Sequence, residues 1–345
     1  MTTPRATAVT VVRRSLLLCA LLRLPLAAQD GPVVGQIEVT VGDLLQAERF
    51  YTEVLQFRRV GTAEHTGDDA ERLQGVFGLH TESVLLQLGD EQLELTQYLA
   101  PVGRPLPADS RSNDRWFQHV AIIVRDMDRA YDRLRRHRVR HSSPLPQTLP
   151  DWNPNAGGIR AFYFQDPDGH PLEVLQFPPG KGDAKWHRAG DDLFLGIDHT
   201  AIVVADTEQG LAFWRDALGL RVVGTSDNHG IEQERLNNVF GAHLRITTLR
   251  GRTGPGVELL EYLTPHTGRT APVDGAANDL WHWAVHVDVD LDGVTRALAA
   301  TPDRFVSPAA VPTAAGRIAI QVRDADGHSA ILTGTRSRAA AAASK

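Results

Sequence analysis

A long segment of this 345-residue chain occurs twice, and the duplication limits the folds that the chain can adopt. Residues 71–101 read ERLQGVFGLHTESVLLQLGDEQLELTQYLAP, and residues 234–265 read ERLNNVFGAHLRITTLRGRTGPGVELLEYLTP. Asp43 returns as Asp206 at a fixed offset (206 − 43 = 163), and Phe50-Tyr51 returns as Phe213-Trp214 at the same offset. A repeat of this period indicates a fold built from copies of one unit. Polar residues at matched places in the copies are therefore candidates for a site.

Composition narrows the function classes. A hydrophobic fraction of 42% over 345 residues is enough for two globular domains. The net charge of −6 predicts no general attraction to nucleic acid, and the basic run at 133–140 is typical of a solvated helix face. The one cysteine, Cys19, lies in an N-terminal apolar segment, so we expect neither a disulfide nor a thiolate metal site in the mature protein.

Residues 1–30 have the layout of an export leader. Arg13 and Arg14 precede a short apolar stretch that ends in small residues, an arrangement that resembles a twin-arginine signal. The apolar stretch is too short to span a membrane, and no later segment could do so. We therefore expect an exported, periplasmic protein, and the alternative is a cytoplasmic protein with an unstructured start.

Four units follow the leader, each with the predicted order strand, helix and three strands. Their opening strands are apolar or alternating, and aspartates follow the first three of these strands as helix N-caps. The opening strands are expected at 36–41, 118–124, 197–204 and 281–289. The Pro- and Gly-rich stretch at 178–190 is a linker between two predicted domains, 33–178 and 195–334, and residues 335–345 form a tail.

Three opening strands carry a polar residue at the same place. Gln36, His119 and His199 each stand seven positions before the aspartate that caps the next helix.

Three closing strands likewise carry a carboxylate between apolar residues: Glu94, Glu173 and Glu258. Burying a carboxylate on a central strand costs free energy unless it is paired or bound to a metal. The matched recurrence of both residue types indicates a metal site.

These residues and their motifs resemble the vicinal oxygen chelate superfamily of glyoxalases, bleomycin-resistance proteins and extradiol dioxygenases. The matching runs are 197–202 (IDHTAI), 213–220 (FWRDALGL), 166–173 (DPDGHPLE) and 93–96 (LELT). The resemblance implies an α+β fold with four βαβββ modules that form two glyoxalase-like domains with curled mixed sheets. It also implies that each pair of modules forms a cup around one divalent metal ion.

Carried over by position, the resemblance assigns metal ligands to three modules, namely Gln36, Glu94, His119, Glu173, His199 and Glu258. The fourth module departs from the pattern, because Ile331 stands where Glu173 stands in the second. Its opening strand has Ala284 at the place of His119, with His282 and His286 two residues to either side. If the third module pairs with the fourth, they would form a weaker second site with His199, Glu258 and, as a possible further ligand, His282.

Two pairings of the modules are possible. Sequential pairing of one with two gives the set Gln36, Glu94, His119 and Glu173, and it is the pairing that we expect from the short connection between these modules. Crossed pairing of two with three gives the set His119, Glu173, His199 and Glu258.

The resemblance implies chemistry on a small molecule with two adjacent oxygens. Nitrogen and carboxylate ligands suit Fe²⁺, Zn²⁺, Ni²⁺ or Mn²⁺. In a glyoxalase-like lyase or isomerase, Glu173 is the expected general base. In an extradiol-like dioxygenase, two histidines and one carboxylate hold iron. The alternative from another class is a non-catalytic protein that sequesters a small molecule, and either protein could be a monomer or a homodimer.

Overall fold

The computed structural model describes residues 31–313 and 316–335. The expected leader at 1–30 and all of the expected tail beyond residue 335 lie outside these ranges. Among the described residues, no helix has the length and apolar character that crossing a membrane requires.

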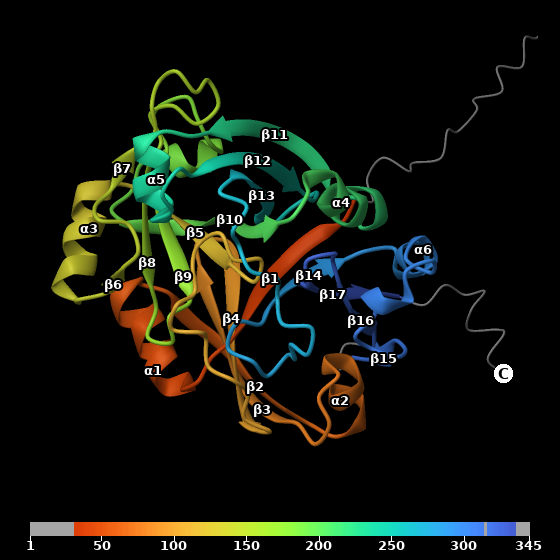
Figure 1. Cartoon of the computed structure of the whole chain (residues 1–345). Coiled ribbons are helices and arrows are strands. Elements are labelled where there is room, and N and C mark those ends of the chain that lie inside the picture. The colour runs from red at the N-terminus through yellow and green to blue at the C-terminus, as the bar shows by residue number, and fades with distance from the viewer. Residues whose placement is uncertain (1–30, 314–315, 336–345) are drawn as a thin grey trace, which may run out of the picture. The chain divides into compact units, whose positions relative to one another are not determined.

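Seventeen strands and six α-helices make up the described chain (Figure 1). The strands are β1 (Val33–Thr40), β2 (Arg58–Thr66), β3 (His80–Leu88), β4 (Glu91–Ala100), β5 (Gln118–Val124), β6 (Arg140–His141), β7 (Gln147–Thr148), β8 (Arg160–Gln165), β9 (Pro171–Gln176), β10 (Phe194–Val204), β11 (Arg221–Asn228), β12 (His243–Arg250), β13 (Gly256–Thr264), β14 (Trp283–Asp288), β15 (Val311–Pro312), β16 (Ile318–Arg323) and β17 (Ser329–Gly334). The helices are α1 (Leu44–Arg49), α2 (Asp68–Gln74), α3 (Met127–Arg136), α4 (Thr207–Leu211), α5 (Ile231–Asn237) and α6 (Leu291–Ala297).

The expected helix caps are present in the first three units. Asp43, Asp126 and Asp206 each accept a hydrogen bond from the backbone N–H three residues ahead, which satisfies a donor that the first helical turn leaves free. In units one and three, α1 and α4 continue directly into π-helical turns, Phe50–Val54 and Ala212–Ala217. The duplicated sequence thus forms the same local structure twice.

The strands form two sheets, and each sheet combines modules from both halves of the chain. One sheet has the order β15-β16-β17-β14-β1-β4-β3-β2, so it joins the first module to the fourth. The other has the order β11-β12-β13-β10-β5-β9-β8-β6, with β7 on β8, so it joins the second module to the third. We call these the 1–4 sheet and the 2–3 sheet.

The expected sequential pairing of modules is therefore wrong. The central contacts are the antiparallel pairs of β1 with β14 and of β5 with β10, which lie in different sheets. The short connection at 101–117 carries the chain from one sheet to the other instead of joining neighbours. A pair of equivalent ion pairs supports the crossed arrangement: Arg104 binds Asp279, and Arg269 binds Asp114.

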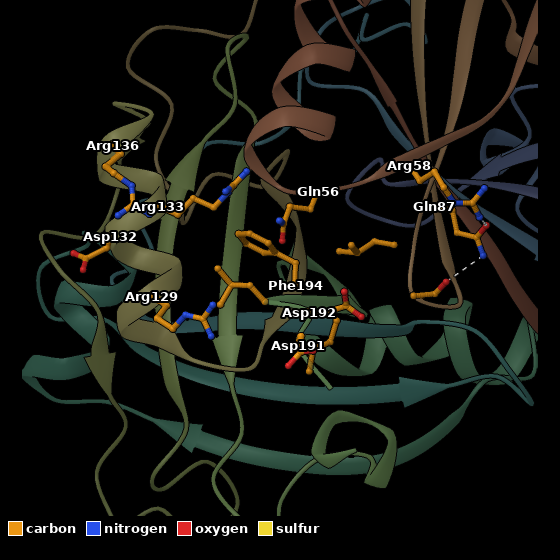
Figure 2. A pocket seen from close by; sticks show the side chains of 14 residues that line it. Gln56, Arg58, Gln87, Arg129, Asp132, Arg133, Arg136, Asp191, Asp192 and Phe194 are labelled. Carbon is orange, nitrogen blue, oxygen red and sulfur yellow. Dashed lines mark hydrogen bonds between the residues drawn. The ribbon is translucent and has the colours of Figure 1, made fainter. Parts of the chain in front are cut away.

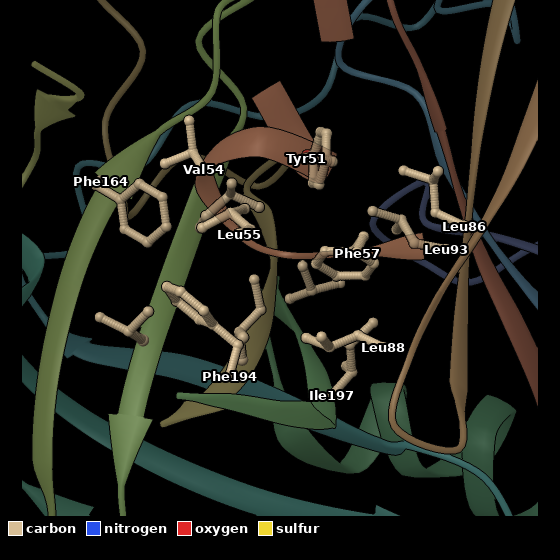
Figure 3. Packing of buried hydrophobic residues seen from close by; sticks show 14 of the residues in the cluster. Tyr51, Val54, Leu55, Phe57, Leu86, Leu88, Leu93, Phe164, Phe194 and Ile197 are labelled. Carbon is tan, nitrogen blue, oxygen red and sulfur yellow. The ribbon is translucent and has the colours of Figure 1, made fainter. Parts of the chain in front are cut away.

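The largest cluster of buried apolar residues spans both sheets. Tyr51, on the π-helical turn after α1, and Leu55, directly after that turn, are fully buried. The cluster around them includes Leu93 of the 1–4 sheet and Phe164 of the 2–3 sheet. Figure 3 shows Leu55 and Phe57 between Phe164 on one side and Leu86 and Leu93 on the other. A shared core of this kind fixes the first module against the second even though they belong to different sheets.

Candidate metal centre

Four polar side chains meet on one face of the 2–3 sheet, each from a different central strand. His119 is on β5, Glu173 on β9, His199 on β10 and Glu258 on β13. The register explains the meeting. Ala201 pairs with His119 on one side and with Glu258 on the other, and directly paired residues project to the same face.

The distances within this group are short. His119 Nε2 lies 3.2 Å from Glu173 Oε2, and His199 Nε2 lies 3.8 Å from the same oxygen. His199 Nε2 also lies 3.3 Å from Glu258 Oε2. The ligand atoms of His119, Glu173 and His199 are all within 4.8 Å of one another, which is close enough for one metal ion to reach all three.

The hydrogen bonding of the group is incomplete in a way that fits a cation. Both ring nitrogens of His119 are buried and lack a hydrogen-bond partner within the described chain, since its contact with Glu173 is not aligned as a hydrogen bond. Glu258 accepts one hydrogen bond, from Thr248 at 2.7 Å. Buried polar atoms without partners cost free energy, and a metal ion would satisfy His119 Nε2, the ring nitrogen that lies beside Glu173.

Electrostatics in the cluster favour positive charge. Burial alone lowers the pKa of His199, but the neighbouring Glu258 and Asp198 carboxylates outweigh it and raise this pKa to about 9. A metal ion bound to Nε2 would replace the proton that these carboxylates attract.

A cavity of about 1160 Å³ opens onto the cluster, and all four side chains line it. Apolar and aromatic residues form part of its wall, including Leu236, Ile246 and Phe177. Asp90 of the β3–β4 turn and the first two residues of β4, Glu91 and Gln92, also line it, so the first module helps to enclose a site built by the second and third. The volume suits an organic ligand in addition to a metal ion.

Tyr163 also lines this cavity, and the sequence patterns did not single it out. It pairs directly with Glu173 across β8 and β9, and its ring centroid lies 4.9 Å from that of His119. Burial and the nearby Glu173 and Glu258 charges raise the pKa of Tyr163 well above its ordinary value, so the hydroxyl stays protonated. The sequence contained one signal for Tyr163. The strands around it and Glu173 form a hairpin, and residues that pair directly across a hairpin project to the same face of the sheet.

The 1–4 sheet does not reproduce this cluster. Gln36 and Glu94 lie there, and the structure does not bring them together with His119 and Glu173. At the places that match His119 and Glu173, the 1–4 sheet has Ala284 and Ile331, which are buried together in a small apolar cluster.

A different polar group stands beside these positions in the 1–4 sheet, and it is saturated with hydrogen bonds. Thr96 and His286 donate to the two oxygens of Glu38, at 2.9 Å each. Ser83 and Gln36 donate to the two oxygens of Glu94. Every carboxylate oxygen of this group already has a partner, so the donor set does not call for a metal ion.

His282 directly precedes β14 of the 1–4 sheet, whereas His199 and Glu258 lie in the 2–3 sheet. The backbone carbonyl of His282 accepts a hydrogen bond from the backbone N–H of Thr40 on β1, and burial, opposed by the charge of Glu38, lowers the pKa of its imidazole. The weaker second site, which combined His282 with His199 and Glu258, is therefore not assembled.

Two further features lie away from the cluster. Asp166, Asp168 and His170 are close together, but Asp166 accepts three backbone N–H bonds and the backbone N–H of Gly42 donates to Asp168, so they form the expected hairpin turn.

A second cavity, of about 660 Å³, is lined by residues of α3, the β2–β3 region and the segment before β10 (Figure 2). Arg129, Arg133 and Arg136 face it together with three aspartates, and it contains none of the candidate ligands.

Comparison with models of protein families gives one match, which covers most of the chain. The profile of the Glyoxalase/Bleomycin resistance protein/Dioxygenase superfamily matches residues 33–174 and 196–331. The comparison with curated proteins found no match.

Among solved structures, glyoxalase I from Zea mays is 16% identical, with a TM-score of 0.56 over 88% of this chain and 92% of that one. A putative dioxygenase from Bacillus subtilis is 14% identical, with a TM-score of 0.53 over 90% of this chain and 87% of that one. At these identities the likeness establishes the fold.

Proposed function

The chain belongs to the glyoxalase/bleomycin resistance protein/dioxygenase superfamily, and we propose that it is a divalent-metal-dependent enzyme whose centre lies in the 2–3 sheet. His119, His199 and Glu173 hold the metal, and Glu258 is the fourth residue of the cluster. The substrate is a small molecule with two adjacent oxygens.

One observation carries this proposal: the contrast in hydrogen bonding between the two sheets. In the 1–4 sheet, all four oxygens of Glu38 and Glu94 accept hydrogen bonds. In the 2–3 sheet, His119 is buried with two ring nitrogens that find no partner in the described chain. This imidazole stands within reach of Glu173 and His199, so a metal ion bound to its Nε2 would satisfy one of the two nitrogens.

When bound, the metal supplies Lewis acidity to a substrate oxygen, and two histidines with carboxylates suit Fe²⁺, Zn²⁺, Ni²⁺ or Mn²⁺. The two carboxylates have different surroundings. The Glu173 side chain is 5% exposed and contacts both imidazoles, whereas the Glu258 side chain is 18% exposed and contacts only His199.

We assign the general base to Glu258, in place of the Glu173 that the resemblance suggested. Thr248 holds Glu258 Oε1, which leaves Oε2 to turn from His199 toward a substrate carbon and accept its proton. Glu173, enclosed between the two histidines, serves as a ligand. The neutral Tyr163 hydroxyl can donate a hydrogen bond to a substrate oxygen as negative charge develops there.

With Glu173 as a ligand and Glu258 as a separate base, the site suits a glyoxalase-like proton transfer.

A specific observation favours a second candidate, an extradiol-like dioxygenase. The His119, His199 and Glu173 atoms that lie within 4.8 Å form the two-histidine, one-carboxylate set of non-haem iron oxygenases.

Paired variants test the assignment. Metal content and turnover of thiol adducts of 2-oxoaldehydes are measured for the wild type, Glu173→Gln and Glu258→Gln, with Glu94→Gln as the matched control in the other sheet. We expect Glu173→Gln to lose metal, Glu258→Gln to keep metal but exchange no substrate proton with D₂O, and Glu94→Gln to keep both.

Oxygen uptake with catechols by the iron-loaded protein would favour the dioxygenase instead. A wild-type protein that takes up none of the four metals, yet binds small aromatic compounds, would refute the enzyme and favour sequestration.

A further inference from the structure

We propose that Asp198 is a positioning residue that orients His199 and thereby sets the affinity of the metal centre. This inference rests on the proposed function in one respect, because it takes His199 as a metal ligand. Its own basis is a set of contacts around Asp198 that the duplicated sequence did not reveal.

The contact between the two side chains is direct. His199 Nδ1 lies 3.0 Å from Asp198 Oδ2, and both residues are buried. A carboxylate accepts hydrogen bonds and does not donate them, so Nδ1 carries the proton and Nε2 is left as the ligand atom. Nε2 is the atom that faces Glu173 and Glu258. A carboxylate on the far nitrogen of a ligand histidine fixes the ring and raises its basicity.

A local irregularity in β10 makes this contact possible. Neighbouring residues in a regular strand project to opposite faces, so an adjacent Asp and His would be separated by the sheet. The pairing of β10 with β5 shifts register between Ile197 and His199, at Asp198 itself. Such a bulge re-aims a side chain, and both Asp198 and His199 consequently line the same cavity.

Asp198 is in turn held by donors from two other segments. Arg250 Nη2 donates to Oδ2 at 2.7 Å, and the Trp186 indole N–H donates to Oδ1 at 3.1 Å. Arg250 Nη1 also donates to the Asp198 backbone carbonyl at 2.8 Å. With both oxygens engaged, the carboxylate has little freedom to rotate away from His199.

The segment that supplies Trp186 also supports the other side of the bulge. Lys185 lies 4.3 Å from the centre of the Trp186 ring and forms an ion pair with Glu91. Glu91 in turn accepts a hydrogen bond from the backbone N–H of Ile197, at 3.2 Å. The chain between the two halves therefore fixes the residue before Asp198 as well as Asp198 itself.

The 1–4 sheet provides an internal comparison. Gly35 stands at the place of Asp198, and Gln36 at the place of His199 (198 − 35 = 163). Gln36 donates to Glu94 and has no imidazole to orient. The 1–4 sheet has no counterpart of His119, Glu173 or His199, and it also has no counterpart of Asp198. This is expected if Asp198 serves the metal centre and is not required by the fold.

The test compares Asp198→Asn and Asp198→Ala with Asp324→Asn in the full chain. Asp324 is a matched control, because it is equally buried and also accepts an indole hydrogen bond at 3.1 Å, from Trp214, but touches no ligand. Cobalt is titrated in competition with a chromophoric chelator, and its visible spectrum is recorded. The Nδ1–H proton resonance of His199 is followed by NMR in the metal-free protein.

We expect Asp198→Ala to weaken cobalt binding about 10–100-fold, to change the cobalt spectrum and to remove the downfield Nδ1–H resonance, with Asp198→Asn intermediate. Asp324→Asn should lower the melting temperature while affinity and spectrum stay at wild-type values. Unchanged affinity and spectrum in both Asp198 variants would overturn the proposal. A wild type that binds no cobalt would refute the proposed function, and the Nδ1–H resonance would then decide on the orientation of His199 alone.

Discussion

The buried imidazole of His282 should make the protein sensitive to acid, and His282→Phe should remove that sensitivity. His282 is 9% exposed, and its Nε2 has no hydrogen-bond partner in the part of the chain that the structure describes. Phe117 stands at the matching place directly before β5 (282 − 117 = 165), so the fold already accepts phenylalanine at this position of the repeat. The substitution therefore removes a titrating group and preserves the bulk of the side chain.

The size of the effect follows from the pKa. Burial, which outweighs the attraction of Glu38, lowers the pKa of His282 from 6.5 to about 4. The unfolded chain therefore binds a proton below pH 6.5 that the folded chain does not bind until pH 4, and stability falls as the pH decreases through this window. Between pH 7 and pH 5 the loss is about 2 kcal/mol, and below pH 4 it approaches roughly 3 kcal/mol.

Urea unfolding at pH 7, 6 and 5 measures this loss in the wild type, in His282→Phe and in a variant of an exposed histidine, His65→Phe. Other groups titrate in all three proteins, so the informative quantity is the difference between variants at each pH. We expect His282→Phe to lose about 2 kcal/mol less than the wild type between pH 7 and pH 5, and His65→Phe to follow the wild type. Parallel curves for the wild type and His282→Phe would refute the argument that His282 is buried in its neutral form.

Three other outcomes can be measured. Tyr163→Phe should lower turnover about 100–1000-fold with metal content unchanged, because it removes one hydrogen-bond donor to the developing charge. Steady-state kinetics and metal analysis check this, and normal activity would contradict it. Leu55→Ala should cost about 2–5 kcal/mol in the free energy of unfolding, because the side chain is fully buried in the cluster that joins the sheets; a loss under 1 kcal/mol in urea would count against that packing. Chelation should lower the melting temperature of the wild type but not of Glu173→Gln, because only a protein that binds the ion gains stability from it.

Local and short-range features could be predicted from the sequence. The caps at Asp43, Asp126 and Asp206, the hairpin turn at Asp166 and the strand–helix order depend on neighbours in the chain, and the structure contains them. The repeat also identified Glu258 as a candidate ligand and left two possible groups of neighbours for it, one for each pairing of the modules. The pairing of the modules could not be predicted, because strand partners far apart in the sequence leave no local signature.

The residues that the sequence did not reveal depend on geometry that only the folded chain possesses. Asp198 precedes a candidate ligand, but a regular strand would place it on the opposite face, and the bulge cannot be read from composition. Glu38 and His286 occupy places where the 2–3 sheet has alanine, so the repeat gave no reason to expect a polar pair there.

The crossed arrangement also determines the order in which the chain can complete its parts. All strands of the 2–3 sheet lie between residues 118 and 264, whereas the 1–4 sheet needs β1–β4 from before this span and β14–β17 from after it. The 2–3 sheet is thus inserted, as one continuous segment, within the sequence that forms the 1–4 sheet. During synthesis from the N-terminus, every strand of the 2–3 sheet is made before β14 is made. The 1–4 sheet can form only by closing the long loop between Glu38 and Ala284, so we expect it to be completed after the 2–3 sheet.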